Sequence, residues 1–333
     1  MTLRLRFACD VYDLLEPIIR GEVTVEGAEL ETIVMDSRRH DLMAREGSFD
    51  LCEFSMCSYL VARDRGLPLV AIPVFPRRMF VERYLFVRGD SILRSPADLA
   101  GRRVGIHRWQ NTLAFWTRAW LRDHAGVDPD GVRWVIAKPE AVEGGSRPGL
   151  HRERAPDGVS LGALLEAGAI DALAAPDIPR AFLDGSGRIR RLLPDFRAAE
   201  QEGFRRTGVF PIMHVVVMRA DLAEREPELA ARLVRAFSEA RRRAVERFSA
   251  HPTRISIPWF WAQLEEDRRI AGDDPWPYRA SANRATLETM LRHALEDRLV
   301  SRRLALEELF AAGSEEVEDP QTVPTLAAAV RAS

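Results

Sequence analysis

Short apolar stretches alternate with helical patterns through the first two thirds of the chain, and this alternation restricts the fold more than any other feature. We predict strands at residues 3–9, 30–34, 49–54, 69–74, 84–88, 103–106, 133–137, 169–174 and 213–219. Helical patterns lie between them, at 13–19, 40–45, 58–65, 112–124 and 161–167. This order predicts an α/β protein with largely parallel sheets. The last third predicts helices instead, at 227–248, 283–299 and 304–311.

The composition excludes several classes of protein. The chain has 333 residues, 46% hydrophobic and 29% charged, as in a soluble globular protein. A formal net charge of −2 gives no electrostatic footprint for nucleic acid or an anionic membrane. Lys138 is the single lysine among 48 Lys and Arg residues, and its neighbours (AKPEAVEGG) are typical of an exposed loop. We therefore exclude catalysis through a lysine Schiff base, including pyridoxal phosphate chemistry.

The cysteines and the start of the sequence bear on location. Cys9, Cys52 and Cys57 show none of the paired spacings of zinc or redox sites, which favours buried thiols in a reducing compartment. The first residues, MTLRLRFACDVYD, alternate as in a strand and contain no apolar run of signal-peptide length. No run of about 18 apolar residues occurs elsewhere. These features predict a cytoplasmic protein.

The stretch "SPADLAGRRVGI" at 95–106 indicates a boundary, because it resembles the entry into the second lobe of periplasmic-binding-protein-like folds. Such folds have two α/β lobes, two crossovers and a ligand cleft between the lobes. We predict a two-lobed, type II fold of this kind. Residues 1–90 and 208–333 would form the first lobe, including the C-terminal helices, and residues 91–207 the second lobe. The stretch 139–158, rich in Gly, Pro and Arg, predicts a mobile excursion.

Polar residues follow four of the predicted strands, where ligands bind in open α/β sheets. A pocket of hydroxyls, amides and arginines there would suit an anionic small molecule, including a di-acid. The predicted binding residues are Tyr12, Asp13, Ser55, Ser58, Arg77, Arg78, Arg108, Gln110, Asn111 and Thr112.

Several of these residues have a purely structural interpretation as well. Ser58, Asn111 and Thr112 are equally typical of helix caps. One arginine of the pair 77–78 is expected to make a salt bridge rather than a ligand contact. No pair of His or carboxylate residues shows metal-ligand spacing such as HxxxH or HxH, so we predict no metal and no cofactor.

Glu53 and His214 are the candidate acid and base. Glu53 lies in an apolar strand, where half-burial would raise its pKa and suit a proton donor; a salt bridge to an arginine is the alternative. His214 stands at the start of the apolar strand "HVVVM", and Pro211 stiffens the approach to it. It is either a hydrogen-bonded core histidine or a general base facing the interlobe cleft.

Longer stretches resemble the 4,5-dihydroxyphthalate decarboxylase family, over nearly the whole chain to about Phe310. They are "AIPVFPRRMF", "LLEAGAIDAL", "RRTGVFPIMHVVV", "GDDPWPYRASANRATLE" and "LALEELF". The resemblance implies cofactor-independent decarboxylation of a hydroxylated aromatic acid, with protocatechuate as the product of the namesake reaction. It favours His214 as the general base and Glu53 as the acid. The chain departs from the family pattern at Leu14, where an arginine is expected, and around His107, so the substrate is open.

Two other functions compete with a decarboxylase. One is a solute-binding protein for an aromatic or small organic acid, of the ABC-transporter type, and the missing secretion signal counts against it. The other is a dehydratase-type lyase resembling chorismate dehydratase. In each case we expect a small-molecule acid as partner, no nucleic acid and no membrane, and we leave a homo-oligomer open.

Overall fold

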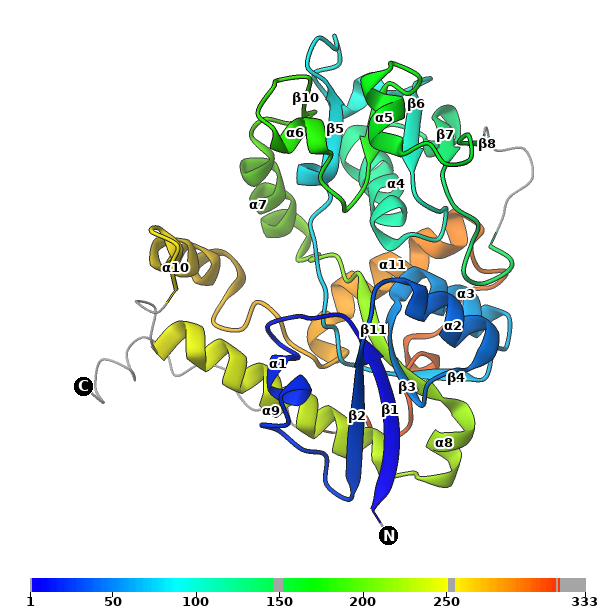
Figure 1. Cartoon of the computed structure of the whole chain (residues 1–333), viewed down its shortest axis with the longest axis vertical. Helices are drawn as coiled ribbons and strands as arrows, with labels where there is room; N and C mark the ends of the chain where they lie inside the picture. Colours follow the sequence, from blue (N-terminus) through cyan, green and yellow to red (C-terminus); the bar gives the residue numbers. More distant parts are fainter. Residues whose placement is uncertain (1, 146–151, 251–254, 316, 318–333) are drawn as a thin grey trace.

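The computed structural model describes residues 2–145, 152–250, 255–315 and 317. These residues form two separate sheets, one above the other in Figure 1. The five-stranded sheet has the order β2 (Ala28–Val34), β1 (Leu3–Cys9), β3 (Leu51–Ser55), β11 (His214–Arg219) and β4 (Leu69–Ile72). The six-stranded sheet has the order β10 (Ile189–Arg191), β5 (Leu85–Arg88), β9 (Ala172–Ala174), β6 (Arg103–Ile106), β7 (Arg133–Ile136) and β8 (Arg152–Arg154).

Helices connect and cover the sheets. The α-helices are α1 (Glu16–Ile19), α2 (Arg38–Glu46), α3 (Met56–Asp64), α4 (Thr112–Ala125), α5 (Leu161–Glu166), α6 (Arg180–Leu183), α7 (Phe196–Thr207), α8 (Ala220–Arg225), α9 (Leu229–Ala250), α10 (Phe260–Ala271) and α11 (Arg284–Glu296). Single 3₁₀ turns occur at Glu82–Tyr84, Pro96–Leu99, Pro129–Gly131, Ser281–Asn283 and Leu306–Glu308. None of the helices in the described ranges is long and apolar enough to span a membrane.

The predicted α/β class with two sheets is confirmed, and the details differ in three places. The sheets are mixed rather than largely parallel, because β11 runs antiparallel to β3 and β4, and β5 runs antiparallel to β9 and β10. The predicted helix at 304–311 is wrong: after one 3₁₀ turn the chain extends, and Ala311 N donates to Ala71 O beside β4. Helices α6, α7, α8 and α10 and strands β8 and β10 were not predicted.

The division into lobes stays a prediction, and one strand bears on its boundary. β5 precedes residue 90, yet it pairs with β9 and β10 of the six-stranded sheet. The predicted excursion at 139–158 contains β8, which pairs with β7, while residues 146–151 lie outside the described part. By sheet membership, the chain therefore enters the second sheet before β5 and returns to the first at β11.

Two segments carry the chain between the sheets, residues 73–84 and 208–213, and they lie side by side. Met79 N donates to Pro211 O (3.1 Å), and Arg77 O accepts hydrogen bonds from Met213 N (2.9 Å) and His214 N (3.2 Å). The start of β11 is thus held by one backbone oxygen of the first crossing segment, that of Arg77. Because β11 is also paired on both sides and buried, His214 has a fixed position between the two sheets.

Candidate functional site

The side chains of His214 and Glu53 form a hydrogen-bonded pair in the five-stranded sheet, near the end of β3 and the start of β11. His214 is opposite Ser55 in the β3–β11 register, and its Nδ1 contacts Glu53 Oε1. The same oxygen accepts from the hydroxyl of Tyr12 (3.0 Å), and Oε2 accepts from Asp10 N (3.2 Å). An ionised carboxylate only accepts hydrogen bonds, so Nδ1 of His214 carries the proton. Nε2 is therefore the basic nitrogen.

Glu53 is ionised in this setting. Its carboxylate is ion-paired with Arg39 of α2, and both side chains are almost completely inaccessible to solvent. Burial by itself raises the pKa of a carboxyl, but the hydrogen bond from His214 and the charge of Arg39 hold the pKa of Glu53 well below its usual range. The expectation of a raised pKa and a proton-donating Glu53 is therefore wrong, and the alternative, a salt bridge to an arginine, is what the structure contains.

His214 itself is neutral near pH 7. Burial lowers the pKa of its imidazole below 6.5, and the neighbouring Glu53 only partly offsets this effect. The ring of His40 meets that of His214 edge to face, with centroids 5.1 Å apart. Burial also lowers the pKa of His40, to well below its usual value, so this second imidazole is neutral too. A neutral, oriented imidazole can accept a proton from a weak acid.

His40, Glu53 and His214 are also the one group in the described ranges whose spacing could hold a metal ion, with ligand atoms within 4.8 Å of one another. Both oxygens of Glu53 already accept hydrogen bonds, however, and the Arg39 guanidinium lies against them. A dication would have to displace these donors and approach a fixed positive charge. The donor set is thus better suited to orienting His214 than to coordinating a metal.

Arg77 and Arg78 are adjacent but have different surroundings. Arg77 is half-buried, and within the described part of the chain no hydrogen bond or ion pair engages its guanidinium. Its charge lowers the pKa of Tyr12 against the larger effects of burial and Glu53, and it adds to the lowering of the pKa of His214 by burial. An unpaired guanidinium beside a neutral histidine is a ready partner for a carboxylate.

Arg78, by contrast, is buried in the protein. Its Nη2 donates to Pro277 O (2.8 Å) and to Asn283 Oδ1 (2.5 Å), and burial lowers its pKa to about 9. The guanidinium lies 5.4 to 5.8 Å from the ring centroids of Phe75, Phe210 and Trp276. Arg78 therefore attaches the "DPWPY" segment (residues 274–278) to the crossing segments, and its predicted contact with a ligand stays a prediction.

Hydroxyl groups join the helices that begin at the two sheets. Thr112 Oγ1 lies 2.9 Å from Ser55 Oγ and accepts a hydrogen bond from Cys57 N (3.2 Å). Ser55 caps α3 by accepting from Ser58 N (3.4 Å). The N-termini of α3 and α4 therefore meet here, one from each sheet, and both Ser55 and Thr112 are buried at this contact.

The remaining predicted binding residues have structural partners. Asn111 Oδ1 caps α4 through Ala114 N, Asp13 Oδ1 accepts from Leu14 N, and Arg108 pairs with Asp41 at 2.9 Å. Gln110 Nε2 donates to two carbonyls of the 139–145 loop. Ser58 is buried within α3. The predicted site residues that lie together at the facing edges are Tyr12, Glu53, Ser55, Arg77, Thr112 and His214; their roles stay predictions.

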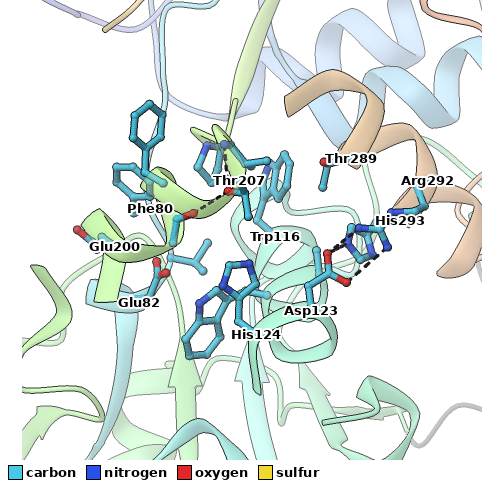
Figure 2. Close-up of a pocket in the computed structure, with 17 residues that line it drawn as sticks. Phe80, Glu82, Trp116, Asp123, His124, Glu200, Thr207, Thr289, Arg292 and His293 are labelled. Carbon is cyan, nitrogen blue, oxygen red and sulfur yellow. Dashed lines mark hydrogen bonds and ion pairs between the residues drawn. The ribbon is translucent and has the colours of Figure 1, made fainter. Parts of the chain in front are cut away.

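A cavity of about 180 Å³ between α4, α7 and α11 offers another set of polar groups (Figure 2). Two histidines line it: Nδ1 of His124 lies 2.8 Å from Arg206 Nη2, and His293 is fully engaged, because its Nε2 contacts Asp123 (2.8 Å) and its Nδ1 contacts Arg122 (3.1 Å). Asp123 also pairs with Arg292 at 2.6 Å. These contacts fasten α11 to α4 and leave no basic nitrogen on His293. A larger cavity, of about 720 Å³, lies beside α7 and α10 and is lined partly by Arg78.

His214 lines neither cavity. We nevertheless place the candidate chemistry at His214, because this site combines an orienting carboxylate with a basic nitrogen and a guanidinium that no residue of the described ranges engages. The sequence analysis missed Arg39 and His40, which lie on α2 with no spacing signal. A buried carboxylate in "LCEFS" could have indicated a cationic partner, since a buried charge is stable only when it is paired.

Comparisons with known proteins show relatives and a shared fold. The chain is 34% identical over 317 residues to a 4,5-dihydroxyphthalate decarboxylase of Comamonas testosteroni, covering 92% of this chain and 96% of the relative. It is 30% identical over 211 residues to the enzyme of the same name from Pseudomonas putida, covering 61% of this chain and 82% of that relative. The sequence pattern described as "NMT1/THI5 like" matches residues 25–142.

Solved structures with low sequence identity share the fold. The periplasmic aliphatic sulphonate binding protein SsuA from Escherichia coli is 16% identical with a TM-score of 0.53, covering 92% of this chain and 91% of that one. The desulfurization enzyme DSZB is 16% identical with a TM-score of 0.52, covering 94% and 98%. A binding protein and an enzyme thus share this two-lobed architecture, so the fold does not decide between these functions.

Proposed function

The chain belongs to the 4,5-dihydroxyphthalate decarboxylase family, and from this we infer that it is a decarboxylase acting on a hydroxylated aromatic carboxylate without a cofactor. The observation that carries this proposal in the structure is the pair formed by Glu53 and His214. A solute-binding protein needs groups that bind a ligand. It does not need a neutral imidazole whose tautomer is fixed by a buried, ionised carboxylate, whereas general base catalysis does.

In the proposed reaction, Nε2 of His214 removes the proton of a phenolic hydroxyl para to the departing carboxylate. The phenolate donates electron density to the opposite ring carbon, which takes up a proton from a water molecule, and the proton held by His214 neutralises the hydroxide that remains. The bond from this carbon to the carboxylate then breaks, its electron pair returns to the ring, and CO₂ leaves. After protonation the former phenolic oxygen is a carbonyl conjugated with the ring and accepts this electron pair, so the reaction needs no separate electron sink.

The surrounding side chains have positioning and binding roles in this proposal. Glu53 holds the His214 tautomer through Nδ1, and Arg39 keeps Glu53 ionised. Burial and the neighbouring Glu53 raise the pKa of Tyr12, so its phenol stays protonated and continues to donate to Glu53. Arg77 receives a substrate carboxylate with its unpaired guanidinium.

The test is to incubate the purified protein with a panel of hydroxybenzene mono- and dicarboxylates, and to follow CO₂ release and the ultraviolet spectrum. Turnover that is lost in His214→Asn identifies the enzyme and its base. Tight binding of a panel member without CO₂ release would contradict the proposal and identify a binding protein.

The same proposal covers the type of ligand, the cellular compartment and the oligomeric state of the enzyme. A small-molecule ligand agrees with the binding-protein-like fold and with the substrate named for the relatives. The proposal also keeps the cytoplasm as the site of action, and it treats a homo-oligomer as open, to be settled by sedimentation of the purified protein.

A further inference from the structure

Three polar side chains that the proposed mechanism does not use lie at one edge of the six-stranded sheet. His107 follows β6, Lys138 follows β7 and Asp177 follows β9, and these three strands are parallel neighbours in the order β9-β6-β7. The carboxyl ends of parallel strands meet at the same edge of a sheet. His107 Nε2 lies 3.2 Å from Asp177 Oδ2, and Lys138 N donates to His107 O (2.8 Å).

This edge faces the sheet that carries His214. Arg108, next to His107, is ion-paired with Asp41 of α2, and Thr112 contacts Ser55 at the end of β3. The charge of Arg77 acts on both His214 and Asp177. Arg77 is therefore close enough to act electrostatically on the candidate base and on Asp177 alike.

Asp177 places a carboxylate among positive charges. The hydrogen bond from His107 is the main cause that lowers the pKa of Asp177, and the charges of Arg77 and Lys138 add to it. The Asp177 side chain is nevertheless 82% exposed. An exposed ion pair contributes only about 0–1 kcal/mol, so a stronger anion can readily displace it.

The proposed chemistry requires a receptor on this side of the substrate. If His214 removes the proton of a phenol, the departing carboxylate lies para to that phenol, on the opposite side of the ring. If the hydroxyl group of the substrate contacts His214 on the five-stranded sheet, its departing carboxylate therefore points towards the six-stranded sheet. The described residues that offer positive charge there are the imidazole of His107, when protonated, and the ammonium of Lys138.

We propose that His107 and Lys138 form a carboxylate subsite that Asp177 fills in the absence of substrate, and that an aromatic 1,2-dicarboxylate displaces Asp177 on binding. Arg77 then holds one carboxylate, and the Lys138–His107 subsite holds the other. The ligand class rests on the proposed function, whereas the subsite itself rests on the His107–Asp177 contact and on the place of Lys138 beside His107. Asp177 becomes a specificity residue, because a mono-acid that leaves Asp177 in place gains no second ion pair.

The single lysine makes the test unusually direct. An amine-selective acylating reagent labels only Lys138 and the N-terminal amine, and peptide mass spectrometry follows each of them separately. At a phthalate concentration of about ten times Kd, acylation of Lys138 should slow by roughly tenfold, while the N-terminal amine keeps its rate. Benzoate at saturation should leave Lys138 unprotected. Equal protection by benzoate, or none by phthalate bound at saturation, would overturn the subsite.

Two matched variants complete the experiment. Asp177→Asn should lower the Kd for phthalate several-fold, because the competing carboxylate is gone. Asp157→Asn, which removes another exposed carboxylate that pairs with Arg154, should leave this Kd unchanged. Phthalate has no hydroxyl group, so neither measurement depends on decarboxylation. Protection without turnover on any substrate would reject the proposed function and keep the subsite, whereas turnover without protection would reject the subsite alone.

Discussion

Replacing Arg77 and Arg78 separately by glutamine tests whether two neighbouring arginines have separate tasks. Arg77 has no described partner, so Arg77→Gln should leave stability unchanged to within about 0.5 kcal/mol. It should weaken substrate binding, because a hydrogen bond to a charged group contributes about 1.5–3 kcal/mol, which corresponds to a roughly 10- to 150-fold increase in Kd.

Arg78→Gln should have the opposite effect. The variant loses two hydrogen bonds, at 2.8 and 2.5 Å, and three aromatic contacts, and it leaves the buried Asn283 Oδ1 without this donor. We expect a loss of about 3–5 kcal/mol. With an unfolding entropy of about 2.1 cal/mol/K per residue, a loss of 3 kcal/mol lowers Tm by on the order of 4 °C. Ligand affinity should persist in the folded protein.

The two measurements are differential scanning calorimetry and isothermal titration with a bound aromatic acid, carried out on both variants. The pairing is informative because the same substitution is made at consecutive positions of one segment. If Arg77→Gln destabilised the protein and bound ligand normally, while Arg78→Gln lost ligand affinity without a change in Tm, the assignment of tasks would be reversed and the reasoning refuted.

Three further predictions concern catalysis. His214→Asn should lower turnover at least about a hundredfold while folding and substrate binding persist; near-normal turnover would return His214 to a structural role. Because burial lowers the pKa of His214 below 6.5, kcat/KM should be level near neutral pH and fall about tenfold per pH unit only below that pKa; a decline that begins above pH 6.5 would contradict a neutral base. Activity should survive exhaustive dialysis against a chelator; loss with EDTA and recovery with one divalent ion would identify His40, Glu53 and His214 as metal ligands.

Patterns confined to one stretch of chain could be predicted well. The valines of "HVVVM" predicted a strand beginning at or next to His214, and β11 begins at that residue. Tyr12 and Arg77 were predicted as site residues because each follows a strand, and both lie at the candidate site. One available inference was not used: adjacent residues of an extended segment face opposite sides, so Arg77 and Arg78 could not both have faced a ligand.

Properties that depend on distant partners could not be predicted. The low pKa of Glu53 depends on His214 and on Arg39. Arg39 reaches β3 from a helix earlier in the chain, and nothing in the spacing of Arg39 and Glu53 indicates their contact. Gln110 looked like a ligand-binding amide because it follows a strand. Its partners are the carbonyls of Val142 and Gly144, in a loop whose path the sequence does not reveal. Whether a polar side chain belongs to the candidate site or only stabilises the fold thus depends on its burial and on its partners, and the residue type alone does not decide it.

The hydrogen bonds between the two crossing segments have a consequence for how such a chain can diversify. Residues 85–207 leave and re-enter the first sheet through neighbouring segments, so the second sheet is in effect an insertion with adjacent ends. Such an insertion can be exchanged for that of a relative if the contacts that join α4 to α3 and α11 are kept. The proposed base and Arg77 would stay with the host, while His107, Lys138 and Asp177 would travel with the insert. Recombination at these segments would therefore alter which acids are accepted and preserve the reaction.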